Sequence, residues 1–247
     1  MNSTTPIKNL DEFLFGISIG VRFRANFAIE DRLGEIVDTI LYSENSFFSP
    51  SVFPEVVSGI DNRKILKNEK TGDLLHIDNS NLVLEVFFQS AEGVFEQKSF
   101  SRIIEAFNKQ IIAGVMREFK IKEIARIGYI RKYLFKIEDL ARAFVGKTIG
   151  NSLGGINDID LRFSKKIPSA EGTVKQNVND YFNAIFNVIK KANRDEIYMS
   201  VDFQKFFDPF LPSYSEIDLL KFVEEATSFN QKSYLPWLNS NFVEGSK

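Results

Sequence analysis

The stretch RKILKNEKTGDLLHIDNSNLVLEVFF, residues 63–88, predicts the fold more directly than any other part of the chain. It contains strand-like apolar runs at 63–67, 74–77 and 82–88. The breaks at 70–73 and 78–81 carry Gly, Asp, Asn and Ser, which favour turns because they tolerate or stabilise tight backbone bends. Short turns between consecutive strands indicate a β-meander. We therefore expect antiparallel pairing in this region.

Further elements are expected on both sides of this meander. Strands are predicted at 17–23, 124–137, 159–163, 180–191 and 197–203, and helices at 33–41, 100–115, 138–148 and 214–228. The strands show alternation of apolar and polar residues, and the helices show apolar residues three or four positions apart. The order is therefore β-α-β-β-β-α-β-α-β-β-β-α. Because the strands cluster, we expect an α+β fold with mixed or antiparallel sheets packed against helices.

The chain of 247 residues is long enough to bury a large core without disulfide or metal crosslinks. Residues 1–10 are predicted to form a polar, mobile leader, and residues 11–247 a single α+β domain. The two halves look alike because each gathers strands beside a closing helix, although no repeat aligns in sequence. The Gly-rich loop GNSLGG at 150–155 is where a subdivision would fall.

Composition narrows the function classes. The chain has no cysteine, which excludes disulfides, thiol nucleophiles and cysteine-ligated metals. The start MNSTTPIKNLDEF lacks the basic and apolar segments of a secretory signal, and no apolar run reaches about 18 residues. We therefore expect a cytoplasmic protein without a membrane span. With 25 Phe against one Trp, the core is expected to be rich in aromatic rings.

Motifs that resemble catalytic signatures lack the context that the chemistry needs. GISIG at 16–20 matches the G-x-S-x-G nucleophile elbow, yet Ser18 lies in an alternating strand and not in a strand-to-helix turn. GKT at 146–148 resembles the end of a P-loop, but Ala141 stands where the first glycine belongs. His76 is the sole histidine and defines neither a triad nor a zinc site. The sequence therefore favours a protein that is not an enzyme and that uses no cofactor.

Carboxylates suggest one candidate metal site. Asp158 and Asp160 share one face of a strand and could bind Mg²⁺ together, with Asp202 as a further ligand. No spacing fixes a third ligand, so solvated surface charge is the simpler interpretation. Asp78 and Glu85 flank a hairpin like the acidic residues of many metal-dependent nucleases, but Phe87, two residues after Glu85, stands where such sites need a lysine.

The strand at 124–137 carries the clearest candidate binding surface. Cations are interleaved there with aromatic rings, a combination that binds single-stranded nucleic acid or phosphorylated ligands through phosphate pairing and base stacking. The candidate residues are Arg126, Tyr129, Arg131, Lys132, Tyr133 and Lys136. The basic residues at even positions share one face, and Arg131 lies on the other face with the two tyrosines. An amphipathic strand with snorkelling Lys and Arg side chains is the alternative interpretation.

The tetrapeptide Arg126-Ile127-Gly128-Tyr129 also resembles the start of an R-I-G-x-R-Y-type strand. That strand marks a sporadically distributed family of uncharacterised prokaryotic proteins of similar length. The next residues depart from the pattern, because its Arg and Tyr are displaced and its Asn is absent. FGISIGVRF at 15–23 and MSVD at 199–202 are similar in their placement along the chain. The resemblance implies an α+β protein encoded among mobile or defence-linked genes, and it transfers no catalytic residue.

These observations favour a non-enzymatic interaction or accessory protein in a prokaryotic defence or mobile-element assembly. Its partner would be another protein or a second copy of the chain, joined through sheet edges or charged surfaces. A nucleic-acid or nucleotide-binding protein that uses the strand 126–136 is the first alternative. A metal-dependent hydrolase is the second, and no membrane partner is expected.

Overall fold

The computed structural model describes residues 7–42, 48, 55–58, 63–69, 71–88, 100–135, 159–168, 181–190 and 196–242. Its strands are β1 (Leu14–Phe23), β2 (Glu55–Ser58), β3 (Lys64–Lys67), β4 (Leu74–Ile77), β5 (Asn81–Phe87), β6 (Ile124–Phe135), β7 (Ile159–Pro168), β8 (Tyr181–Lys190) and β9 (Ile197–Leu211). The meander predicted from residues 63–88 is present as β3, β4 and β5. The helix predicted at 138–148 and the subdivision at 150–155 lie outside the described residues.

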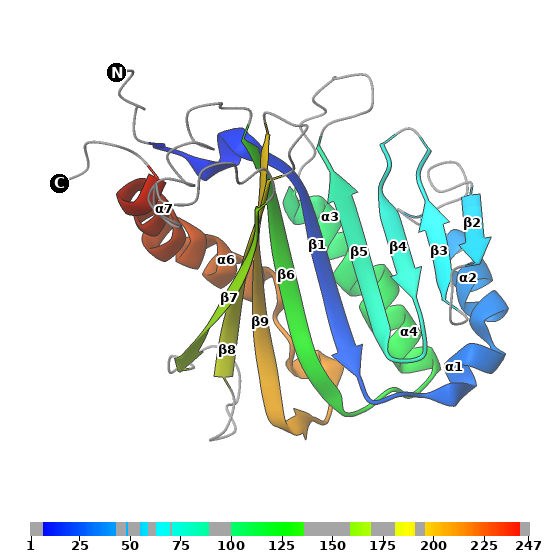
Figure 1. Cartoon of the computed structure of the whole chain (residues 1–247). Coiled ribbons are helices and arrows are strands. Elements are labelled where there is room, and N and C mark those ends of the chain that lie inside the picture. The colour runs from blue at the N-terminus through cyan, green and yellow to red at the C-terminus, as the bar shows by residue number, and fades with distance from the viewer. Residues whose placement is uncertain are drawn as a thin grey trace.

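All neighbouring strands are antiparallel, and they form one nine-stranded sheet with the order β2-β3-β4-β5-β1-β6-β9-β8-β7 (Figure 1). The predicted α+β class with an antiparallel sheet is therefore confirmed. The pairing expected between the strands at 180–191 and 197–203 is also present, as β8 with β9. β2 was not predicted, and β9 continues to Leu211, well past its predicted end.

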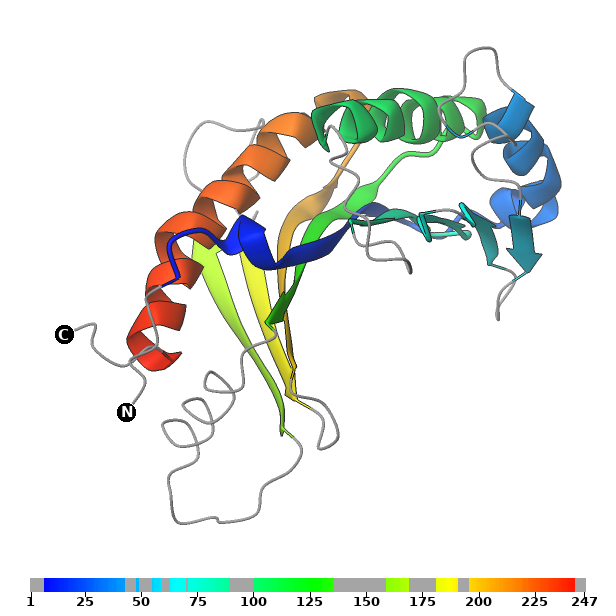
Figure 2. The ribbon, with the colours of Figure 1, turned by 90° about the horizontal axis from the view of Figure 1, so that it is seen from above.

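The helices are α1 (Phe27–Asp31), α2 (Leu33–Tyr42), α3 (Phe100–Ala106), α4 (Ala113–Glu118), α6 (Leu219–Phe229) and α7 (Leu235–Phe242), with 3-10 turns η1 (Leu10–Phe13) and η4 (Tyr214–Glu216). A π-helical segment joins α3 to α4 (η3, Phe107–Ile112) and another joins α6 to α7 (η5, Asn230–Tyr234). The final helix begins later than predicted because the Asp218 carboxylate accepts a hydrogen bond from the Lys221 backbone N–H at 3.0 Å and caps it. The described helices lie on one face of the sheet (Figure 2).

The sheet is nearly symmetric about its central pair, β1 and β6. β5, β4 and β3 follow outward from β1, and β9, β8 and β7 follow outward from β6. A helix with a π-helical segment follows β5 in the chain, and another follows β9. The prediction of two similar halves concerns these same elements, and it stays a prediction because the halves share no alignable sequence.

Alternate residues of strands such as β5 and β6 face the helices and form the core. In β6 the odd-numbered residues from 127 to 135 are buried, and the even-numbered residues are half-buried on the opposite face. This period of two follows from the pleat of a strand. The largest fully buried side chains are mostly aromatic and include Phe23, Phe107, Tyr133, Phe135 and Tyr234. The core is therefore rich in aromatic rings, as the Phe count suggested.

Residues 7–10, the last part of the predicted leader, pack against the fold. Leu10 is 0% exposed, and Ile7 is also buried. The backbone N–H of Ile7 donates to Asn239 Oδ1 at 2.9 Å, and Asn239 Nδ2 donates to the Ile7 carbonyl at 2.8 Å. These bonds join the start of the described chain to α7.

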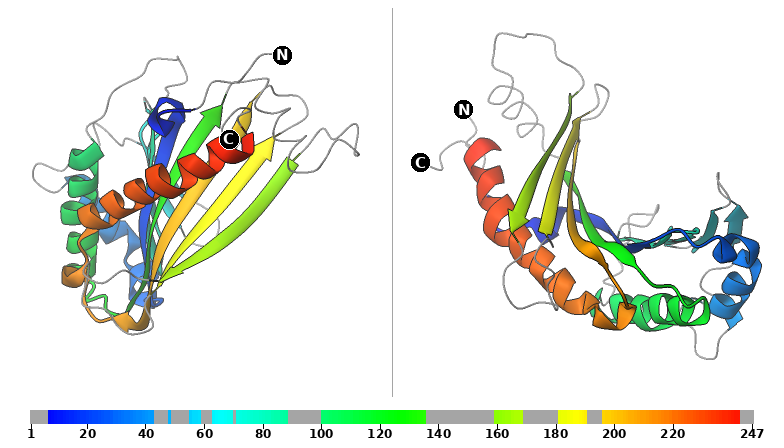
Figure 3. Two further views of the ribbon diagram at one scale, coloured as in Figure 1. Left: turned by 90° about the vertical axis from the view of Figure 1, so that its left-hand side faces the viewer. Right: turned by 90° about the horizontal axis from the view of Figure 1, so that it is seen from below.

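The second face of the sheet is concave and carries none of the described helices. Seen from above and below, the sheet bends so that β7, β8 and β9 stand at an angle to β2–β5 (Figures 2 and 3). The helices follow the outside of the bend, and the other face lies on its inside. We call this second surface the open face.

Candidate binding site on the open face of the sheet

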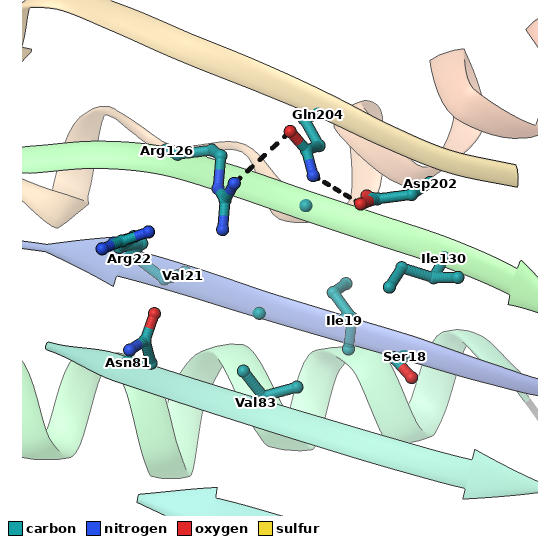
Figure 4. A pocket seen from close by; sticks show the side chains of 12 residues that line it. Ser18, Ile19, Val21, Arg22, Asn81, Val83, Arg126, Ile130, Asp202 and Gln204 are labelled. Atoms are coloured by element: carbon teal, nitrogen blue, oxygen red, sulfur yellow. Dashed lines mark hydrogen bonds between the residues drawn. The ribbon is translucent and has the colours of Figure 1, made fainter. Parts of the chain in front are cut away.

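A hollow lies at the centre of the open face, where β1 and β6 carry small residues. Gly16, Ser18 and Gly20 of β1 point to this face, followed by Arg22 on the same face, and Gly20 pairs directly with Gly128 of β6. The missing side chains leave a hollow of about 100 Å³ (Figure 4). Ser18 is 4% exposed in the interior of the strand, so the G-x-S-x-G sequence is a strand segment with small residues on one face and not a nucleophile elbow.

Glycine is required at position 20 by close packing between β1 and β5. A Cβ atom there would stand 2.8 Å from Val83 Cγ2 and 2.9 Å from the Leu82 carbonyl oxygen. Both distances are shorter than van der Waals contact, and one of the atoms is backbone. At Gly128 the nearest atoms would be 3.8 Å and more away, so this glycine leaves space that a small ligand group can enter.

Charged and amide groups surround the hollow. Arg22 and Arg126 are paired across β1 and β6 at one end of it (Figure 4). Arg126 Nη1 donates to Gln204 Oε1 at 3.4 Å, and Gln204 in turn donates to the Asp202 carboxylate. Arg22 is exposed and forms no ion pair with any residue that the structure describes. One guanidinium is therefore held in place, and the other is available to a ligand.

Burial shifts two of these groups toward their neutral forms. Burial raises the pKa of Asp202 above its ordinary range, while the hydrogen bond from Gln204 and the charge of Arg126 act in the opposite direction. Burial also lowers the pKa of Arg126, and the neighbouring charge of Arg22 adds to this effect. An anion beside the two guanidinium groups would relieve the repulsion between them.

Aromatic rings extend this cationic pair across the open face toward β7. Arg126 Cζ lies 5.5 Å from the centre of the Phe206 ring, and Phe206 stacks on Tyr181 with centroids 4.9 Å apart and planes at 10°. Lys166 Nζ lies 3.9 Å from the centre of the Tyr181 ring. We call these five residues, Arg22, Arg126, Phe206, Tyr181 and Lys166, the cation–aromatic ladder. They come from β1, β6, β9, β8 and β7 in order across the sheet.

Three of the six residues predicted from the basic strand lie on the opposite, helix-covered face. Tyr129, Arg131 and Tyr133 are 2%, 3% and 0% exposed. Arg131 forms a salt bridge through Nη2 with the Asp11 carboxylate of η1, and its Nη1 donates to Thr227 Oγ1 at 3.4 Å. Burial raises the pKa of both tyrosines. These side chains pack in the interior, on the face opposite Arg126 and Lys132, as the alternation along the strand predicted.

Lys132 lies on the open face but is paired within the protein. Its Nζ donates to Glu85 Oε2 at 2.7 Å, and His76 Nε2 lies 3.5 Å from Glu85 Oε1. Lys132 reaches β5 across β1 because Gly16 has no side chain, so sequence spacing could not reveal this lysine beside Glu85. Burial lowers the pKa of His76. Lys136, the last of the six predicted residues, lies outside the described residues.

The predicted metal ligands are not brought together. Asp160 is exposed on the outer strand β7, where it pairs with Ile189, whereas Asp202 pairs with Ile185 of the intervening strand β8. The two carboxylates are therefore separated by a whole strand and by four positions along it. Asp158 lies outside the described residues. In the part of the chain that the structure describes, no three potential metal-ligating side chains are grouped.

The sheet and its open face define an α+β protein with a hollow and a cation–aromatic ladder on an accessible sheet surface. Comparison with protein-family models, with curated proteins and with solved structures gave no match. The resemblance of residues 126–129 to a family strand therefore stays a prediction. Among the described residues, no helix is both long and apolar enough to cross a membrane.

Proposed function

We propose that this protein binds single-stranded nucleic acid on the open face of its sheet. The observation that carries the proposal is the cation–aromatic ladder, in which two stacked rings lie between exposed or half-buried cations across five strands. Phosphates would pair with the cations, and a base would take the place of the Arg126 or Lys166 cation on an outer face of the Phe206–Tyr181 stack. Stacking contributes about 1–3 kcal/mol per base and tolerates any sequence.

The shape of the open face supports a flexible strand as the ligand. Neighbouring strands are about 4.8 Å apart, so a ladder from β1 to β7 covers roughly 19 Å. A chain that follows this line would lie in the concavity of the sheet, where water screens charges less than it does on a convex surface. The hollow at Gly128 adds a recess beside Arg126 that can take a base edge or a phosphate oxygen.

Of the two alternative functions predicted from the sequence, this proposal retains nucleic-acid binding. It places the binding site on the ladder and not on the basic strand alone. Of the predicted basic-strand residues, Arg126 belongs to the ladder, while Arg131 and Lys132 bind carboxylates of the protein itself. The separation of Asp160 from Asp202 gives no support to a metal-dependent hydrolase. A role in a prokaryotic defence or mobile-element assembly stays a prediction based on the resemblance.

The test is the binding of a fluorescently labelled oligonucleotide of about 16 nucleotides, followed by anisotropy at several salt concentrations. We expect Arg22→Ala to weaken binding about tenfold and to lower the salt dependence by about 0.7 for each phosphate that the arginine neutralises. Phe206→Ala should weaken binding by a similar factor with an unchanged salt slope, because it removes a stacking ring and no charge. Arg117→Ala is the matched control, because Arg117 is an exposed arginine of α4 on the helix side.

Equal affinities for the wild type, Arg22→Ala and Phe206→Ala would contradict the proposal. A clear preference for duplex over single-stranded oligonucleotide would contradict single-stranded nucleic acid as the ligand. Circular dichroism of each variant checks that the sheet is intact.

A further inference from the structure

The outer strand β7 presents a long backbone edge. Among the described strands, β7 is the last of the sheet on that side, and it pairs with β8 along all ten of its residues. The opposite outer strand, β2, has only four residues. Positions 162–166 of β7 are exposed, including Phe163 with 39% of its surface accessible. Such an edge is a template for a further strand, because every second N–H and C=O points outward.

The charge pattern of β7 is complementary to itself. A two-fold axis perpendicular to the sheet would place residues of the same face opposite each other in an antiparallel pair. With the axis at Phe163, Asp160 lies opposite the partner's Lys166, and Arg162 lies opposite the partner's Ser164. The two-fold axis generates each of these pairs twice. The dimer therefore contains two Asp160–Lys166 pairs, and no two like charges lie opposite each other. Cross-strand pairs of this kind stabilise a sheet.

Neighbouring registers lack this complementarity. A shift of the axis by one residue toward the start of β7 places Arg162 opposite the partner's Arg162. A shift by one residue in the other direction places Arg162 opposite the partner's Lys166. Like charges directly opposite each other destabilise a strand pair. Of these three registers, charge therefore favours the one centred on Phe163.

An apolar contact lies at the centre of this register. The Phe163 ring stacks on Phe186 with centroids 4.9 Å apart and lies 5.2 Å from the Trp237 ring. Its exposed part would meet the same ring of a second copy, because the axis passes through this position. Aromatic pairs across strands contribute roughly 0.2–1 kcal/mol relative to a pair of alanines. Phe163 would then be covered on both sides.

We propose that two copies of this chain pair through β7 into an antiparallel dimer with one continuous sheet. The two open faces would lie on the same side of this sheet and form one extended surface. The inference rests on the charge pattern and exposure of β7; it shares Lys166 with the cation–aromatic ladder, but it does not require nucleic-acid binding.

The test is the molar mass in solution, measured by light scattering and by sedimentation over a range of concentrations. We expect the wild type to have twice the chain mass of 28.3 kDa. Asp160→Lys should raise the dimer dissociation constant at least tenfold, because it places two lysines opposite each other at both ends. The double variant Asp160→Lys with Lys166→Asp should restore the dimer, since it exchanges the partners without changing the register.

Glu224→Lys provides the matched control, because it makes the same charge change at an exposed position of α6. The fluorescence of Trp237, the only tryptophan, reports that β7 is still packed in each variant. A wild type that stays monomeric at high concentration would overturn the proposal. So would an Asp160→Lys variant that dimerises as well as the wild type. Arg22 lies far from this edge, so dimerisation and nucleic-acid binding can fail separately.

Discussion

At the scale of single residues, the sequence identified several side chains that matter but assigned some of them to the wrong surroundings. Arg126 and Asp202 were both singled out, one for anions and the other for metal. The structure places them beside one hollow, linked through Gln204. Gln204 carried no signal in the sequence, because its importance depends on the neighbours that strand pairing brings to it. Arg22 was likewise missed, since only the pairing of β1 with β6 places it opposite Arg126.

Asp202 gives a prediction about pH. Its pKa is raised in the folded protein, so its ionisation lowers stability at neutral pH. This cost disappears as the pH falls through the folded-state pKa, because the carboxyl is then protonated in the folded protein. We expect Asp202→Asn to increase the free energy of unfolding at pH 7 and to lose this advantage toward acidic pH. Urea unfolding at a series of pH values measures this difference in the free energy of unfolding. Glu224→Gln, at an exposed position, is the control.

At the scale of elements, β6 shows why a correct strand prediction can give an incorrect site. The alternation along residues 124–137 predicted the strand and assigned its residues to two faces. It could not show that helices cover the face with Arg131 or that Asp11 provides the counter-charge there. The basic residues of one strand therefore have different roles. The ladder, in contrast, is made by five strands, and no single segment of sequence contains it.

The packing of β1 against β5 gives a prediction at the same scale. Gly20→Ala should lower the free energy of unfolding by about 1–3 kcal/mol, because the new methyl group would overlap Val83 and the Leu82 carbonyl. Gly34→Ala is the contrasting control, since Gly34 is an exposed residue of α2 with nothing within 4 Å of an added Cβ. It should be neutral or stabilising by up to ~1 kcal/mol. Equal losses from both substitutions, measured in urea, would contradict this packing.

At the scale of the whole molecule, the central pair of β1 and β6 joins the two sides of the sheet. These strands pair from Leu14 with Tyr133 to Phe23 with Ile124, and one hydrophobic core lies under both sides. On the helix side, α3 contacts α6 across the middle (Figure 2). The sheet and its core therefore continue across the place where the two similar halves would meet.

This continuity predicts cooperative unfolding. We expect thermal transitions followed by Trp237 fluorescence and by far-ultraviolet circular dichroism to coincide, although Trp237 lies on one side only. Two separate transitions would instead show that the halves are independent units. Gly20→Ala serves as an internal check, because it disturbs the other side of the sheet and should shift both signals equally.

The sequence by itself determined the class of fold, because the alternation of apolar residues and the turn residues between strands act over short distances along the chain. It also indicated the aromatic-rich core and the strand character of residues 124–135. Only the tertiary structure decided which strands far apart in the sequence are neighbours, which face the helices cover and which charged side chains meet. Those outcomes depend on contacts between residues far apart in sequence, and local pattern carries no information about such distances.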